Sequence, residues 1–600
     1  MSNYKAPVKD ILFATRHLAD LEGITALPGY EDATHDLLEA ILQEAAKIGE
    51  EVLDPLNKVG DIQGSSLNNG EVKTPDGWKE AYSTFIEGGW NGLPFSPDRG
   101  GQGLPWLVAT AVQEIWHSSN MAFGLCSLLT QAAIEAIELH GTEDQKADYL
   151  ANLIRGNWSG TMNLTEPHCG SDLAMIKTQA VSNGDHYLIT GQKIYITYGD
   201  HDMVDNIVHL VLARLPDAPS GTKGISLFIV PKFLRDENGN WTSRNDIETI
   251  SLEHKLGIHG SPTAVLGYGT GKYRKQKGAV GYLVGEENQG MTYMFTMMNI
   301  ARLAVGIQGN GVAERAYQQA AWFAGDRIQG TAIDNSQGDR VAIINHPDVK
   351  RMLMLQKCRI EGLRSLGLIL GGSFDKSLKS EDPETRELAQ AMVDVLTPIV
   401  KSYMTELGLE NVSIALQVHG GMGFIEETGA AQYYRDQRIT PIYEGTNGIQ
   451  ALDLIGRKLL RDQGHISRAV ISFIRADIQN VHQPELKNMK DQITASLDLL
   501  ESSIASILVM ASEDIRKPAG ICDPYLRLWG TICCGWQLAR AAGAALTLDD
   551  GNDPFYPAKI ETARFYFAYE MPKANYHASV IQNGATSIAE LDISLFEVAG

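Results

Sequence analysis

A single carboxylate, Glu444, lies in the stretch PIYEGTNGIQ between the apolar pair Ile442 and Tyr443 and the small residue Gly445. Apolar neighbours remove water from a carboxyl group, which disfavours the ionised form and raises its affinity for a proton. A glutamate in such surroundings is a candidate general base. A solvated glutamate in a surface turn is the alternative, and this stretch alone does not decide between the two.

Two further segments carry groups that bind polar ligands. The loop MNLTEPHCGSD, residues 162–172, offers backbone N–H groups and hydroxyls at the start of a β-rich region, and IYIT, residues 194–197, ends a predicted strand. An ordinary loop between a helix and a strand has the same composition. His168 and Cys169 are adjacent in this loop, but one adjacent pair cannot supply tetrahedral coordination, so we predict no metal site.

A glycine turn and two arginines complete the candidate set. The turn QVHGGMGF joins two helical runs and places the Gln417 amide near Gly420 and Gly421, which let a ligand approach the backbone closely. A helix C-cap with a tight turn is the alternative. Arg327 follows a helical stretch and is either a surface residue or a partner for a pyrophosphate. Arg302 lies in the apolar run MMNIARLAVG, and a buried arginine must be paired or face a ligand.

The elements that hold these segments follow from the spacing of apolar residues. Helical spacing extends from about 33 to 155, and short β-rich segments separated by Gly, Asp, Asn and Pro extend from about 160 to 285. Long helical runs return from about 288 to 460. The order along the chain is therefore helical, then β, then helical.

The last part of the chain continues the helical pattern. Its apolar residues recur at steps of four and three along one helix face: Ile493, Leu497, Leu500, Ile504 and Ile507. We therefore predict four domains: an N-terminal helical domain (1–160), a middle β domain (161–285), a helical bundle that carries Glu444 (286–464) and an additional C-terminal helical domain (465–600).

Composition excludes several classes of function. A net charge of −22 over 600 residues opposes binding to nucleic acid or to an anionic membrane surface, because both need basic patches. The six scattered cysteines suggest no disulfide framework, and the start of the chain lacks the pattern of a secretory signal. The apolar run FGLCSLLTQAAIEAIELH is interrupted by Gln131, Glu135 and Glu138 and is too polar to span a bilayer. We expect a cytoplasmic protein.

Taken in order, these motifs resemble the acyl-CoA dehydrogenase family from about residue 35 to 460. The resemblance is carried by LTEPxxGSD, the strand ending in IT, the helices of Arg302 and Arg327, the QVHGG turn and IYEGT. The interval from Gln417 to Glu444 also resembles that of the family. The length and the closing helical domain resemble its long bacterial branch, which includes 3-methylmercaptopropionyl-CoA dehydrogenase and dehydrogenases of ordinary fatty acyl-CoAs.

The resemblance implies a mainly α fold with a β-barrel-like middle domain, a C-terminal four-helix bundle and the extra helical domain. It implies FAD as cofactor and conversion of an acyl-CoA thioester to a trans-2-enoyl-CoA. Glu444 would abstract the α proton, while flavin N5 would take the β hydrogen as hydride. The flavin ribityl 2'-hydroxyl and the backbone N–H of Glu444 would stabilise the thioester oxygen, and Gly445 would give that backbone room.

The resemblance also assigns contacts by position. Those to the cofactor are Leu164 and Thr165 at the flavin ring, Thr197 at its N5 edge, Ser171 at a flavin phosphate or the pantetheine, Thr446 at the diphosphate, and Arg327, Gln417, Gly420 and Gly421 at the FAD pyrophosphate of a neighbouring subunit. Arg302 would lie on the CoA side of the substrate. Such a shared site requires at least a dimer, and electron-transfer flavoprotein would be the electron acceptor.

The sequence departs from the family pattern at three points. Tyr195 stands where many relatives have Trp, His168 and Cys169 fill the variable positions of the EPxxGSD loop, and Gly448 replaces Glu or Gln. Two other functions stay open: an acyl-CoA oxidase, and a non-catalytic flavin-bearing protein that protects DNA, which the negative charge and the intact Glu444 oppose. Either 3-methylmercaptopropionyl-CoA or a fatty acyl-CoA would suit as substrate.

Overall fold

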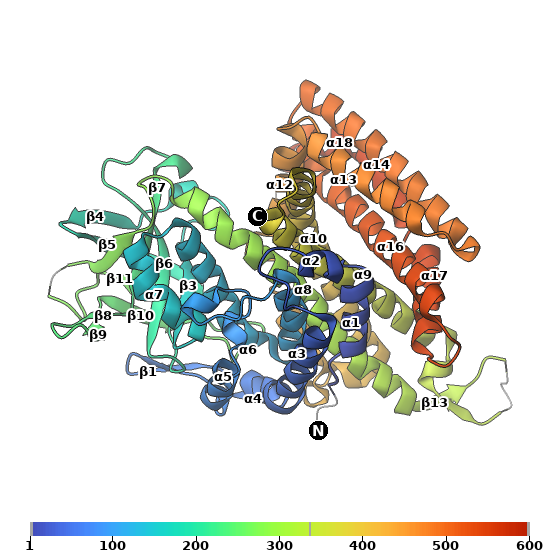
Figure 1. Ribbon diagram of the computed structural model, residues 1–600, viewed down its shortest axis with the longest axis horizontal. Helices are drawn as coiled ribbons and strands as arrows, with labels where there is room; N and C mark the ends of the chain where they lie inside the picture. The colour runs from blue at the N-terminus through green and yellow to red at the C-terminus, as the bar shows by residue number, and fades with distance from the viewer. Residues whose placement is uncertain (1–3, 276, 335–337, 597–600) are drawn as a thin grey trace. The chain divides into compact units, whose positions relative to one another are not determined.

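The computed structural model describes residues 4–275, 277–334 and 338–596 (Figure 1). Its residues form two compact units. The first contains Gln43–Leu104 and Ile115–Ala304 with the start of the chain, and the second contains Pro7–Leu42, Pro105–Glu114 and the chain from Val305 onward. Three helices contribute residues to both units: α3 (His35–Lys47), α6 (Trp106–His140) and α8 (Gly290–Asp326).

The first unit begins with helices. These are the π-helical turn Ile48–Leu53, α4 (Asp54–Gln63), α5 (Trp78–Glu87) and α7 (Glu143–Arg155), with the hairpin β1 (Ser66–Asn68) and β2 (Glu71–Lys73) between them. The start of α7 is fixed by a capping box, in which the Thr142 hydroxyl accepts from the Gln145 N–H and the Gln145 side chain accepts from the Thr142 N–H. The helix α6 bends at Asn120, which has non-helical backbone angles.

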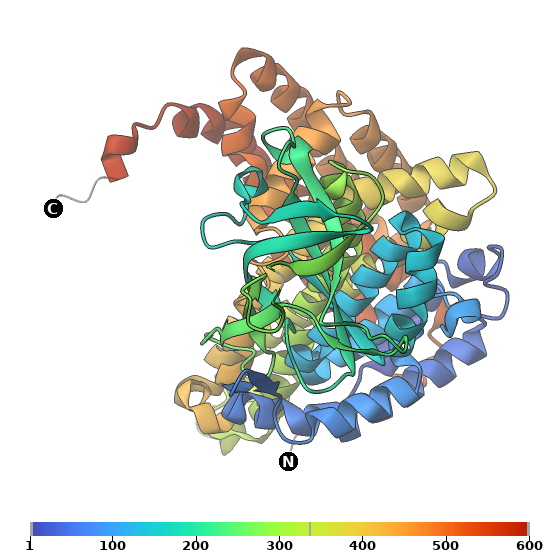
Figure 2. The same ribbon diagram turned by 90° about the vertical axis from the view of Figure 1, so that its left-hand side faces the viewer.

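An eight-stranded sheet fills the rest of the first unit (Figure 2). Its strands are β3 (Trp158–Asn163), β4 (Gln179–Asn183), β5 (His186–Thr197), β6 (Asn206–Arg214), β7 (Ile225–Pro231), β10 (Ile247–Leu252), β11 (Thr263–Tyr268) and β12 (Ala279–Leu283). A separate hairpin joins β8 (Phe233–Arg235) and β9 (Trp241–Arg244).

The order of pairing explains the shape of the sheet. The path runs β10-β11-β5-β12-β7-β6-β3, and β4 pairs with both β5 and β6, so that β5, β12, β7, β6 and β4 close into a ring. Side chains directed into this ring, such as Ile189, Val211 and Phe228, are fully buried. The predicted barrel-like middle domain is confirmed.

The second unit is helical. Its helices are α1 (Val8–His17), α2 (Leu21–Thr25), α9 (Pro347–Lys379), α10 (Pro383–His419), α11 (Ala430–Gln437), α12 (Asn447–Ile455), α13 (His465–Asp477), α14 (Lys487–Glu513), α15 (Arg516–Gly520), α16 (Cys522–Leu548), α17 (Phe555–Tyr569) and α18 (Lys573–Ala589). A short hairpin, β13 (Ile328–Thr331) and β14 (Arg340–Ala342), follows α8.

The helices after residue 465 pack on the bundle helices that precede them. Contacts join α16 to α9, α10 and α12, and α17 to α9. The face predicted for α14 is confirmed, because the five residues predicted to share it are all buried: Ile493, Leu497, Leu500, Ile504 and Ile507. The additional C-terminal helical domain therefore has a core of its own and is also packed against the bundle.

Buried ion pairs cross the same packing surface. Arg359 and Glu570 are both 2% exposed, and their side chains lie 3.0 Å apart. Lys559 on α17 contacts Glu361 at 2.9 Å and also pairs with Asp10 of α1. Because a charge removed from water must be paired, each of these contacts fixes the relative position of two helices that are far apart in sequence.

Two helical stretches among the described residues are long and apolar enough to cross a membrane, judged by length and composition. They are Trp106–His140, whose most apolar window is 78% buried, and Pro484–Glu513, whose window is 39% buried. Core helices of folded proteins pass the same test, so this is weak evidence for a membrane span.

Candidate functional site

Glu444 lies in a tight turn of the second unit, between α11 and α12. The N–H groups of Ile442 and Tyr443 both donate to the carbonyl of Ile439, which closes the turn ahead of it. Glu444 itself has a φ of 54°, in the left-handed region that costs a non-glycine residue roughly 1–2 kcal/mol. Its side chain is half-buried. Backbone strain of this kind is often found at functional sites, and the role of Glu444 as a base stays a prediction.

Contacts on both flanks hold this strained residue. The Tyr443 hydroxyl donates to Gln308 on α8, and burial together with the nearby Glu444 carboxylate raises the pKa of Tyr443 well above its ordinary value. The Gln450 amide donates to the carbonyl of Gly445 at 3.2 Å. The Thr446 hydroxyl accepts from the N–H of Ile449 and so caps α12. The base candidate is therefore presented by a rigid turn at the start of a helix.

The loop that contains Leu164 and Thr165 is organised by a buried ion pair in the first unit. Glu166 Oε1 lies 2.9 Å from Lys193 Nζ on β5, and it also accepts from the Thr178 hydroxyl at 2.6 Å. Lys193 donates in turn to the Leu164 carbonyl at 2.9 Å. Burial acts to raise the pKa of Glu166, but Lys193 and the hydroxyl of Thr178 lower it below its ordinary value.

The same pair brings the loop and the IYIT segment together. The Ile194 N–H donates to the Thr165 carbonyl at 2.9 Å, so the loop residues and the end of β5 lie side by side. The pairing of β5 with β11 shifts register here, and Tyr195 takes a φ of 61° with 61% of its surface exposed. Thr197 pairs with Thr263 at the end of the strand. This bulge re-aims the Tyr195 ring toward solvent.

The remaining predicted residues of the first unit have different surroundings. Ser171 is exposed, and the Asp172 side chain caps the short helical turn that follows it. Arg302 is 4% exposed and lies on α8. The structure therefore confirms that Arg302 is a buried arginine on a helix, while its predicted role at the CoA moiety stays a prediction.

The glycine turn lies at the end of α10 in the second unit. Gly420 is the residue after the helix, with a φ of 59° and a ψ of −140° that only glycine adopts readily. A Cβ placed on Gly420 or Gly421 would meet no atom within 4 Å. The predicted C-cap is confirmed, and the open space beyond both glycines fits the close approach of a cofactor phosphate to the backbone.

Arg327 and Gln417 are both exposed. The end of α8 and the glycine turn are neighbours, because the rings of Phe323 and His419 lie 4.6 Å apart. Gln319 on α8 also donates to the Thr428 carbonyl at 2.7 Å. The structure thus brings the segment that precedes Arg327 to the predicted pyrophosphate-binding turn, and leaves the arginine head accessible.

One group among the described residues has metal-ligating atoms close together. One such atom from each of Glu166, His168 and Cys169 lies within 4.8 Å of the other two. Both oxygens of Glu166 already accept hydrogen bonds, from Lys177 N–H and from Thr178 and Lys193. Burial raises the pKa of Cys169, which keeps its thiol protonated. These contacts explain the group as the organiser of the loop.

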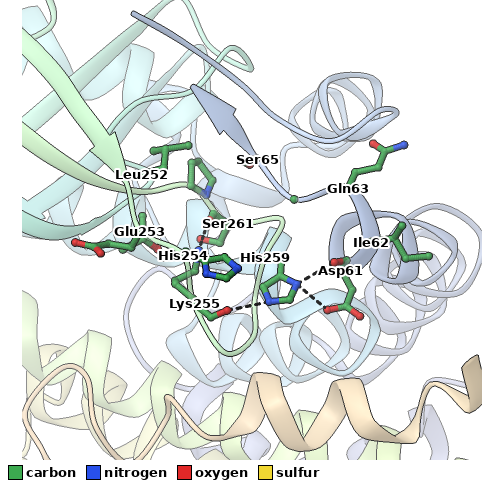
Figure 3. A pocket seen from close by; sticks show the side chains of 13 residues that line it. Asp61, Ile62, Gln63, Ser65, Leu252, Glu253, His254, Lys255, His259 and Ser261 are labelled. Atoms are coloured by element: carbon green, nitrogen blue, oxygen red, sulfur yellow. Dashed lines mark hydrogen bonds and ion pairs between the residues drawn. The ribbon is translucent and has the colours of Figure 1, made fainter. Parts of the chain in front are cut away.

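A separate polar pocket of about 250 Å³ lies in the first unit, where α4 meets the segment after β10 (Figure 3). His259 points between Asp61 and Lys255, with Nδ1 2.9 Å from the Asp61 carbonyl and Nε2 3.0 Å from the Lys255 carbonyl. The pocket contains none of the predicted site residues. Its volume is below the range of about 300 Å³ and more that is usual for ligand sites.

Sequence reasoning missed the residues that support the site. Lys193 and Gln308 lie 27 and 135 residues from their partners Glu166 and Tyr443, and Asn447 contacts α10 more than 40 residues earlier in the chain. Spacing along one sequence does not report such pairs.

Comparison with known proteins places the chain in a family. Four family descriptions match in succession: "Acyl-CoA dehydrogenase, N-terminal domain" at 38–157, "middle domain" at 161–268, "C-terminal domain" at 288–460, and "Acetyl-CoA dehydrogenase C-terminal like" at 470–592. The chain is 46% identical to 3-methylmercaptopropionyl-CoA dehydrogenase of Ruegeria pomeroyi, over 94% of this chain and 95% of that protein. The chain belongs to the acyl-CoA dehydrogenase family.

Two more distant relatives agree with this assignment. A butyryl-CoA dehydrogenase of Syntrophomonas wolfei is 32% identical over 95% of each chain. The crystal structure of a Bacillus anthracis acyl-CoA dehydrogenase complexed with FAD has the same fold, with a TM-score of 0.74 and 21% identity over 94% of this chain and 90% of that one. The protein is an acyl-CoA dehydrogenase with FAD as its cofactor, an oxidoreductase acting on CH–CH bonds.

Proposed function

We propose that Glu444 is the base that removes the α proton of a bound acyl-CoA thioester. The strained backbone of Glu444, held between the anchored neighbours Tyr443 and Gly445, carries this proposal, because a fixed backbone limits the positions that the carboxylate can take. The proton passes to the carboxylate while the β hydrogen leaves with its electron pair, and a trans double bond forms between the α and β carbons.

Bound FAD would supply the acceptor for that hydride. We propose that Leu164, Thr165, Ser171, Thr197 and Thr446 hold it. The backbone N–H of Glu444 would donate to the thioester oxygen, and Arg302 would serve the CoA portion. Gly445 has a φ of 85°, a conformation that glycine adopts without strain. Because glycine has no Cβ, the backbone directly after the base stays open to a close approach by the substrate.

We further propose that the protein works as a homodimer, with Arg327, Gln417, Gly420 and Gly421 directed at the FAD pyrophosphate of the second subunit. The exposed arginine head and the open glycine turn support this arrangement. The reduced flavin must be reoxidised before the next turnover, and we propose electron-transfer flavoprotein as the acceptor of its two electrons. We propose the cytoplasm as the location of the protein.

For the substrate we propose 3-methylmercaptopropionyl-CoA, with methylthioacryloyl-CoA as product in the degradation of dimethylsulfoniopropionate. The first candidate is supported by the relative from Ruegeria pomeroyi, a 3-methylmercaptopropionyl-CoA dehydrogenase that is 46% identical. The 32% identical relative is a butyryl-CoA dehydrogenase, which supports a short straight-chain fatty acyl-CoA as the second candidate. Comparison of kcat/KM for the thioether substrate and for butyryl-CoA, at equal concentrations and with the same electron acceptor, decides between them.

The experiment that tests the mechanism is Glu444→Gln. The amide has nearly the same shape but accepts no proton at neutral pH. The variant should therefore keep its fold and its FAD, but substrate should no longer reduce the flavin, as measured by its absorbance. A variant that reduces its flavin at the wild-type rate would refute the assignment of the base.

A further inference from the structure

The side chain of Asn447, three residues after Glu444, is held by several groups of α10. Its Oδ1 accepts from Lys401 Nζ at 3.1 Å and from the Thr405 hydroxyl at 3.2 Å. Its Nδ2 donates to Glu406 Oε2 at 2.9 Å. Donors lie on one side of the amide and acceptors on the other, so only one orientation of the side chain satisfies them.

These contacts matter because Asn447 is the first residue of α12, and the strained turn of Glu444 leads directly into it. The Asn447 N–H donates to the Pro441 carbonyl at 3.0 Å, which closes the turn across Glu444. Lys401 is fully buried. The contacts of Asn447 with α10 therefore fix one end of the segment that presents the base.

A charge in the C-terminal helical domain completes the connection. Glu406 binds Asn447 through Oε2, and its other oxygen, Oε1, lies 3.2 Å from Arg527 Nη2 on α16. Arg527 is itself oriented by Asp523, 2.9 Å away on the same helix. The helices α10, α12 and α16 pack against one another in this region (Figure 1).

We propose that the additional C-terminal domain positions the catalytic base through the relay Arg527–Glu406–Asn447. Arg527 holds the Glu406 carboxylate, which is about one-third exposed, in the rotamer that accepts from Asn447. Asn447 then fixes the turn that carries Glu444. The proposal rests on the proposed role of Glu444 and gives the added domain a part in the reaction, with Arg527, Glu406 and Asn447 as positioning residues.

The first test removes the charge at the far end of the relay. In Arg527→Gln we expect the rate of flavin reduction at saturating substrate to fall about tenfold, because small displacements of a reacting group have large effects on rate. The substrate Kd, the FAD content and the Tm should stay close to those of the wild type. Arg527→Lys should recover part of the rate, because it keeps the charge.

A matched control is available in the same domain. Arg475 on α13 also pairs with two carboxylates, Asp498 at 2.8 Å and Glu501 at 2.9 Å, but has no contact with Glu406 or Asn447 among the described residues. Arg475→Gln should leave flavin reduction unchanged. An equal loss of rate in both variants would show a general effect of the domain and would overturn the relay.

The second test changes the near end without changing its size. In Asn447→Asp one oxygen still accepts from Lys401, but the other faces the Glu406 carboxylate, so we expect the reduction rate to fall at unchanged substrate Kd. Combined with Arg527→Gln, the loss should be smaller than the product of the two single losses, since both act through Glu406. Multiplicative losses, or no loss in either variant, would refute the relay.

The outcomes separate this inference from the proposed function. If the wild-type protein reduces its flavin with acyl-CoA and Glu444→Gln does not, the base assignment stands whatever the Arg527 variants do. If Glu444→Gln is fully active, the proposed function fails, and the relay then has no base to position.

Discussion

Lys193 Nζ lies 2.9 Å from Glu166 Oε1, with the lysine side chain fully buried and the glutamate side chain 3% exposed. Lys193 also donates to the carbonyl of Leu164, so one ammonium group fixes both the turn and the strand beside it. The loop predicted to face the flavin therefore gets its shape from an ion pair between a residue of the motif and a strand residue outside it.

Removing the lysine should cost more than the value of one hydrogen bond. In Lys193→Met the Glu166 carboxylate stays buried without its cation, and breaking such a pair destabilises a protein by about 3–5 kcal/mol. We expect a lower Tm and weaker retention of FAD. The double variant Lys193→Met/Glu166→Gln is the control, because it leaves no buried charge and should recover part of the stability. A Tm equal to that of the wild type in Lys193→Met would contradict this role.

The same pair should make stability depend on pH. The pKa of Glu166 is lowered in the folded protein from its ordinary value of 4.5, so the unfolded chain binds a proton more tightly than the folded one. Its contribution is complete above pH 4.5 and is lost as pH falls through the lower, folded pKa. The difference in Tm between wild type and Glu166→Gln should be largest at neutral pH and shrink in acid. A difference that grows in acid would have the wrong sign.

The glycine turn offers a matched pair of variants. Gly420 has a φ of 59°, so Gly420→Ala should cost about 1–3 kcal/mol of stability from backbone strain. Gly421 is not in a positive-φ conformation, and its Cβ would meet no atom of the chain within 4 Å, so Gly421→Ala should keep its Tm. If FAD lies against this turn, Gly421→Ala should still weaken FAD binding. Unchanged FAD affinity in Gly421→Ala would place the pyrophosphate elsewhere.

Arg327 should contribute to cofactor binding without contributing to folding. It is exposed and lies beyond the end of α8, so Arg327→Ala removes one charge-assisted bond to a pyrophosphate while leaving the core intact. We expect FAD to dissociate about tenfold or more faster, since such bonds contribute about 1.5–3 kcal/mol. Measured FAD stoichiometry after gel filtration checks this. Full retention at unchanged affinity would remove Arg327 from the site.

What the sequence could predict depended on whether the determining contacts are local. The end of β5 at Thr197 and the apolar face of α14 follow from neighbouring residues, and the structure has them as expected. The left-handed conformation of Glu444 and the Lys401–Asn447 contact depend on packing between segments more than 40 residues apart, which apolar spacing does not encode.

The C-terminal helical domain should be required for the stability of the bundle. Truncation after residue 464 would remove Glu570, the buried partner of Arg359, and leave Arg359 with Asn411 and Glu410 as its contacts. The truncation would also uncover the faces of α9 and α10 that α16 covers. An apolar face exposed in this way associates with other copies. We therefore expect the truncated chain to aggregate, and light scattering of the full-length protein to give a dimer of about 131 kDa, twice the chain mass of 65.6 kDa.

A conservative variant, Arg359→Lys/Glu570→Gln, tests the same surface without removing it and should lower the Tm while leaving the dimer mass unchanged. A truncated chain that is soluble and active would show that the bundle is complete without the domain.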